Sequence, residues 1–98
     1  MNDVALTTPI QAHGETVSTL TFRPLTGKDL RTIGDPREYS VTSNGGQTFA
    51  FNGEKMGALM SSLAGIPLSS VDQLSAPDWD ACMLMVTGFF GNGATPQA

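Results

Sequence analysis

The chain has 98 residues, of which 40% are hydrophobic, and this is the size and composition of a single small domain with a modest core. The formal net charge of -4 and the presence of only five basic residues exclude the clustered positive surface that nucleic acid binding requires. A single cysteine cannot form an internal disulfide, and no apolar run approaches the roughly 18 residues of a membrane-spanning helix, so we expect a soluble cytoplasmic protein with no nucleic acid or membrane partner.

Two β-rich runs near the N-terminus predict a β-hairpin of residues 4–10 and 15–22. Gly14 falls in the connection, where a glycine can adopt a positive φ. Because Val17 and Leu20 have opposite parity, the second strand is expected either to contain a bulge or to carry apolar residues on both faces. A lone hairpin is marginal in water, so this one must lie on an apolar surface.

The middle of the chain predicts one short helix and leaves the following segment open. Thr26, with Asp29 three residues later, is a helix start signal, and Gly34 is a stop signal. Residues 35–51 show no sustained helical period. They form either a second small hairpin about residues 44–45 or a mobile loop.

A longer helix and a single helical turn are expected next. The helix begins after Asn52, a good N-cap, and ends at Ala64, where Gly65 stops it. The sequence of residues 69–74 suits one helical turn capped by Ser69.

The last helix is expected to span residues 76–90. Ser75 is an N-cap residue and Asp78 is an acid at the third helical position, which together make a strong start signal. Residues 91–98 have no apolar anchor and are expected to be a disordered tail. The elements together predict an α+β fold, a single domain of residues 1–90 with its N-terminal hairpin packed on two or three C-terminal helices.

Few side chains in this sequence are equipped for catalysis. His13 is the single histidine and is distant in sequence from Cys82, so a Cys/His nucleophilic pair would depend on two isolated residues. Asp78 is better explained as a cap residue and Asp80 as a solvated one, because residues two apart on a helix face different ways. No Cys or His cluster has metal-ligand spacing. The sequence therefore predicts a protein that is not an enzyme and has no cofactor and no metal site.

The apolar residues of the two longer helices are the candidate binding residues. Such residues are most often core, but unbranched methionine side chains can also repack around different apolar partners and form an adaptable groove. A domain with a modest core would also gain from burial against a partner or a second copy, so self-association is an alternative. The candidate protein-binding residues are Met56, Leu59, Met60, Leu63, Trp79, Met83, Val86, Phe89 and Phe90.

The order of several short segments resembles a known family. These segments are residues 4–10, 13–17, 20–31 and 63–74, followed by Asp78 and residues 88–90. In this order they resemble the small tail assembly chaperones of contractile-tailed bacteriophages of the Mu-like and P2-like kinds. Residues 40–51 do not match the family pattern.

The resemblance implies a non-enzymatic role in building a phage tail. Members of the family are thought to coat the long helical tape measure protein in the host cytoplasm, to prevent its aggregation and to help recruit tail tube subunits. The family offers no catalytic motif to transfer. The alternative is a structural or adaptor protein that is retained in the phage tail and oligomerises through the same apolar helices.

Overall fold

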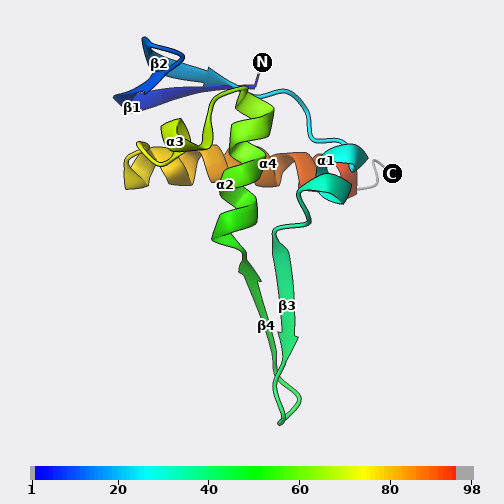
Figure 1. Ribbon diagram of the computed structural model, residues 1–98. Coiled ribbons are helices and arrows are strands. Elements are labelled where there is room, and N and C mark those ends of the chain that lie inside the picture. The colour runs from blue at the N-terminus through cyan, green and yellow to red at the C-terminus, as the bar shows by residue number, and fades with distance from the viewer. Residues whose placement is uncertain (1, 95–98) are drawn as a thin grey trace.

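The computed structural model describes the backbone of residues 2–94 and the side chains of residues 2–90 other than 39 and 49. It confirms the predicted α+β fold: a β-hairpin lies over a set of helices, and α2 crosses in front of α4 (Figure 1). In chain order the elements are β1 Asp3–Ala12, β2 Glu15–Thr21, α1 Gly27–Thr32, β3 Arg37–Val41, β4 Gln47–Phe51, α2 Gly53–Ala64, α3 Leu68–Val71 and α4 Ala76–Ala94.

The N-terminal hairpin has the expected turn, but its bulge lies in β1 and not in β2. His13 and Gly14 connect β1 to β2 with positive φ values of 55° and 76°, as the two central residues of a type I′ turn require. The antiparallel register shifts between Ala5 and Ile10, so that four residues of β1 lie opposite Ser18 alone. The predicted irregularity is therefore present, but it interrupts β1 and not the second strand.

Helix α1 begins at the predicted capping box. The Thr26 hydroxyl accepts a hydrogen bond from the Asp29 N–H at 3.4 Å, and the Asp29 carboxylate accepts one from the Thr26 N–H at 3.0 Å. Arg23 donates two further hydrogen bonds to Asp29, at 2.7 and 2.8 Å. These bonds, of which those from Arg23 matter most, hold the pKa of Asp29 well below its usual range.

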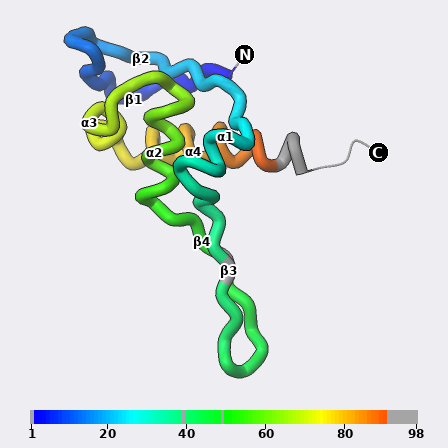
Figure 2. Tube along the Cα trace, turned by 45° about the vertical axis from the view of Figure 1, so that its right-hand side comes forward, coloured from blue at the N-terminus to red at the C-terminus, as the bar shows by residue number. Residues whose placement is uncertain are grey.

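Residues 35–51 contain a second hairpin and not a loop. Strands β3 and β4 pair in regular antiparallel register and form a sheet of their own. This two-stranded ribbon projects away from the rest of the molecule (Figures 1 and 2). The whole molecule, ribbon included, measures 50 × 32 × 25 Å along its principal axes. We call residues 37–51 the ribbon.

Helix α2 has the predicted ends, and α3 differs from its prediction. Asn52 caps α2 by accepting a hydrogen bond from the Lys55 N–H at 3.0 Å, and Gly65 ends the helix in the left-handed conformation, at φ 70°. Helix α3 follows Pro67, and no side chain caps it, so the cap predicted at Ser69 is wrong. Proline has a fixed φ and can precede a helix without a cap bond from its side chain.

Helix α4 begins at Ala76 as predicted and continues to Ala94, past the predicted end at Phe90. Residues 91–94 of the predicted disordered tail therefore belong to α4. Residues 95–98, the remainder of that tail, lie outside the described residues.

The core lies where the hairpin, α2 and α4 meet. Its members are apolar residues with at most 8% exposure, drawn from all three elements and the short segments beside them. They are Val4, Ile10, Ala12, Leu20, Phe22, Met56, Leu59, Met60, Leu63, Ile66, Val71, Cys82 and Val86.

Candidate protein-binding site

Five of the nine candidate binding residues belong to the core and not to the surface of this structure. The hairpin covers α2 on one side and α4 covers it on another, so the apolar stripe of α2 is enclosed. A partner cannot reach these five side chains while the domain keeps this conformation. They are Met56, Leu59, Met60, Leu63 and Val86.

The other four candidates are half-buried and lie on α4. Trp79, Met83 and Phe90 follow the helical period along one flank of the helix, and Phe89 lies nearer the buried side. The Trp79 ring covers Gly57 of α2, since a Cβ built at Gly57 would lie 3.7 Å from the ring. Trp79 thus contributes to the packing of α4 on α2, while the residues at the other end of the flank border an open pocket.

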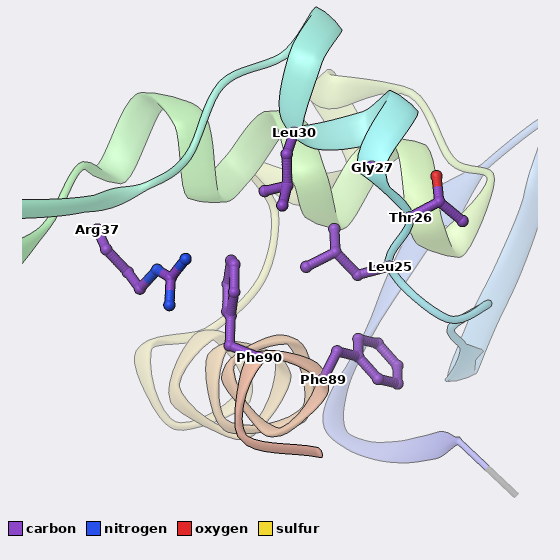
Figure 3. Close-up of a pocket in the computed structure, with 7 residues that line it drawn as sticks. All are labelled: Leu25, Thr26, Gly27, Leu30, Arg37, Phe89 and Phe90. Carbon is purple, nitrogen blue, oxygen red and sulfur yellow. The ribbon is translucent and has the colours of Figure 1, made fainter. Parts of the chain in front are cut away.

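This pocket lies between α1 and the C-terminal part of α4 and has a volume of about 270 Å³. Figure 3 shows Leu30 of α1 and Phe90 of α4 pointing toward one another across it, with Leu25 beside them. We call it the α1–α4 pocket. Its lining residues are Leu25, Thr26, Gly27, Leu30, Arg37, Phe89 and Phe90.

The capping box of α1 places two of the lining leucines. Leu25 precedes the N-cap Thr26, and Leu30 is the fourth helical residue, which are the two positions of a hydrophobic staple. Sequence reasoning assigned neither residue to a site. The staple spacing around Thr26 and Asp29 was the signal that could have identified both.

Arg37 gives one side of the pocket a positive charge. Its guanidinium carbon lies 4.2 Å from the centroid of the Phe90 ring, within the range of a cation–π interaction. The same guanidinium donates to both carboxylate oxygens of Asp35, at 2.7 and 2.9 Å. These hydrogen bonds lower the pKa of Asp35. The aromatic ring is thus held from the ribbon side by a side chain that is itself fixed.

The pocket can accept apolar side chains of a polypeptide. Its volume is about 270 Å³, it is open to solvent, and its lining is mainly apolar. Within residues 2–94, no group of three or more His, Cys, Asp or Glu side chains is placed to hold a metal ion.

The two residues that a nucleophilic site would have needed are engaged elsewhere. Cys82 is fully buried, and burial raises the pKa of its thiol to about 11, with a smaller contribution from the charge of Asp78. His13 lies in the exposed hairpin turn, where its Nε2 is 3.0 Å from the carbonyl oxygen of Gly65 and donates to it in the Nε2-protonated tautomer.

Comparison with known proteins gives one match. Neither the curated proteins nor the solved structures contain a match to this chain. In the part of the chain that the structure describes, no helix has the length and hydropathy needed to cross a membrane. The family model described as "Phage tail assembly chaperone proteins, E, or 41 or 14" matches residues 3–91, and the chain therefore belongs to this family of phage tail assembly chaperones.

Proposed function

We propose that this chaperone binds the tape measure protein of its phage in the host cytoplasm and shields it, without catalysis, until tail tube subunits assemble around it. The observation that carries the proposal is the α1–α4 pocket, which is apolar, open and of side-chain size. A long helical client exposes apolar residues that would otherwise aggregate, and such residues can enter a pocket of this kind.

The chemistry of the pocket supports a polypeptide ligand. Phe89 and Phe90 present aromatic surface, which is the residue class that contributes most to protein interfaces. Because Arg37 holds the Phe90 ring, little side-chain entropy is lost when a partner packs on it. Met83 lies on the same flank of α4 and adds a side chain that adapts to different partners.

Co-expression of the chain with the tape measure protein tests the proposal. The expected result is a soluble complex that contains several copies of the chaperone per client, under conditions in which the client alone precipitates. Native mass spectrometry of the affinity-captured complex gives the number of copies. A client that is equally insoluble with and without the chaperone would contradict the proposal.

A matched pair of variants on α4 tests the pocket itself. Phe90→Ser removes an aromatic lining residue, whereas Leu84→Ser changes a residue that is 69% exposed and lies outside the pocket. We expect Phe90→Ser to reduce the amount of client recovered and Leu84→Ser to leave it unchanged, with both variants retaining the helical circular dichroism of the wild type. If both variants recover the same amount of client, the client binds at a surface other than the α1–α4 pocket.

The composition of purified tails separates this role from that of a structural or adaptor protein. A chaperone that is displaced by tube subunits is absent from finished tails. Stoichiometric amounts of this chain in purified tails would instead establish it as a component of the particle.

A further inference from the structure

The ribbon has an edge that the rest of the fold leaves uncovered. Among the residues that the structure describes, no third strand pairs with β3 or β4. All the described side chains from residue 40 to residue 48 are exposed, and Val41 is 73% exposed. Figure 2 shows the ribbon extending well beyond the helices.

The N-terminal hairpin shows how the same chain covers an edge. The Gln11 N–H on the outer side of β1 donates to Gln73 at 2.8 Å, and the Gln11 carbonyl oxygen accepts a hydrogen bond from Ser70 at 2.6 Å. Asp78 accepts from two more backbone N–H groups of β1. An exposed strand edge is a ready template for pairing, and in β1 side chains from the helical half occupy that template.

The hydrogen bonds at the two ends of the ribbon fix which backbone groups face outward. The Asn52 N–H donates to Pro36 at 2.6 Å, and the Thr42 N–H donates to Gly46 at 2.7 Å. Since hydrogen-bonded pairs alternate along an antiparallel ladder, the even-numbered residues bond within the ribbon. The N–H and C=O groups of Gln47 and Phe49 therefore point out from the β4 edge.

The two edges of the ribbon differ in charge. Strand β3 carries Arg37 and Glu38, which are charges of the kind that discourage edge pairing. Strand β4 has the sequence QTFAF, with no charge, no proline and no glycine. Residues of this kind favour strand pairing, so β4 is the edge without protection.

We propose that two copies of this chain pair through their β4 strands, antiparallel, with Thr48 of each copy opposite Thr48 of the other. Gln47 of one copy then lies opposite Phe49 of the second, and the outward groups of both residues complete the ladder. The result is a four-stranded sheet with β3 on each outer edge. Phe51 lies at the base of the ribbon and packs against the core, and the proposed pairing does not depend on it.

A second copy fits this edge because the edge is self-complementary: in the register above, the outward N–H and C=O groups of Gln47 meet the outward C=O and N–H groups of Phe49 in the other copy. The formal net charge of -4 on each copy opposes association, but β4 has no charged side chain that would add repulsion at the contact itself. Because the ribbon projects from one side of the helices, antiparallel pairing places the two helical bodies at opposite ends of the paired sheet. A two-stranded sheet is only marginally stable by itself. Pairing produces a four-stranded sheet, which exceeds the roughly three strands needed for independent stability.

Disulfide trapping tests the pairing. In this register the two Thr48 residues form a non-hydrogen-bonded pair with Cα atoms about 4.5 Å apart, which is close enough for a disulfide. Ser40 is the register partner of Thr48 on β3, and in the paired sheet the two Ser40 residues are about 14 Å apart. Thr48→Cys and Ser40→Cys are therefore a matched pair of exposed positions, and the native Cys82 is buried in both variants.

We expect mild oxidation to convert Thr48→Cys to a covalent dimer at least ~10 times faster than Ser40→Cys, because pairing raises the effective concentration of the thiols. Similar rates for the two variants would overturn the proposal.

Sedimentation velocity provides a second measurement without cysteines. The interface is small, so dimerisation should be weak and should increase with protein concentration. Thr48→Lys places two like charges opposite one another at the symmetry axis and should abolish the dimer, whereas Ser40→Lys should retain it. A wild-type chain that stays monomeric at the highest concentration reached, or a dimer that persists in Thr48→Lys, would refute pairing through β4.

Discussion

Asp78 on α4 accepts two hydrogen bonds from Thr7 on β1, one from the backbone N–H at 2.9 Å and one from the hydroxyl at 3.0 Å. Its second carboxylate oxygen accepts a third bond, from the Thr8 N–H at 3.0 Å. Both threonines lie in the part of β1 where four residues oppose Ser18, so the carboxylate takes the place of a strand partner. This bond set joins the bulge to the first turn of α4, across 71 residues of sequence.

The burial of Asp78 makes this link dependent on pH. The side chain is 1% exposed, and the hydrogen bonds it accepts, of which that from the Thr7 N–H matters most, lower its pKa. A carboxyl with a lower pKa in the folded state than in the unfolded state stabilises the fold fully above the unfolded pKa of about 3.9. That stability is lost as the pH falls through the folded pKa.

We therefore expect Asp78→Asn to lower the melting temperature at neutral pH and to reduce its fall on acidification. The asparagine NH₂ group cannot accept a hydrogen bond, so one of the N–H groups of Thr7 or Thr8 would face another donor. Differential scanning calorimetry from neutral to strongly acid pH measures both effects. Asp29 remains in the variant and, with its own lowered pKa, should preserve part of the pH dependence.

Asp80→Asn is the control, since Asp80 is exposed on the same helix two residues away. Its melting curve should follow that of the wild type at every pH. An Asp78→Asn variant with the same pH profile as Asp80→Asn would show that the bonds to the bulge contribute nothing to stability.

The two start signals in this chain show how far a sequence pattern can predict structure. Thr26 with Asp29, and Ser75 with Asp78, have the same spacing, and both mark the start of a helix, as predicted. Asp29 completes its capping box, but the Asp78 carboxylate bonds to β1 instead. Local spacing predicts where the helix begins, but it cannot reveal a partner that is distant in sequence.

The candidate binding site was predictable only in part for a similar reason. Helical periodicity identified the apolar residues of α2 and α4, but it could not separate those that the hairpin covers from those left half-buried. The α1–α4 pocket joins Leu25 and Leu30 to Phe90 at the other end of the chain, together with Arg37 of the ribbon. No local pattern brings these segments together, so only the tertiary structure shows the pocket.

Loss of the α1 cap should weaken the wall of this pocket. Thr26→Ala removes the hydroxyl that accepts the Asp29 N–H, and we expect it to destabilise the domain by about 1 kcal/mol, a fall in melting temperature of about 4–8 °C. Thr32→Ala in the last turn of α1 is the control. Its hydroxyl donates only to the Lys28 carbonyl within the same helix, so its loss should have little effect. Equal effects in thermal denaturation would argue against a structural role for the capping box.

Leu59 and Leu84 test the division between core and surface. Leu59 of α2 is fully buried, so Leu59→Ala should reduce the free energy of unfolding by about 2–5 kcal/mol. Leu84 of α4 is 69% exposed, so Leu84→Ala should change the free energy of unfolding by less than about 0.5 kcal/mol. Both values come from urea denaturation followed by circular dichroism. A large loss with Leu84→Ala in dilute solution would mean that this side chain is covered in solution, by a second copy or by part of the chain itself.

Gly57 inside α2 and Gly65 just after its end should respond to substitution by alanine in opposite directions. Gly65 ends the helix at a φ of 70°, and a Cβ there would meet no other atom within 4 Å, so Gly65→Ala is expected to destabilise the domain by about 1–2 kcal/mol through backbone strain alone. Gly57 lies inside the helix, and its Cβ would be at an ordinary contact distance of 3.7 Å from Trp79. Gly57→Ala should therefore stabilise the domain by about 1 kcal/mol, the helix propensity difference between the two residues. If thermal denaturation shows instead that Gly57→Ala destabilises the domain, Trp79 packs against α2 more closely than the structure indicates.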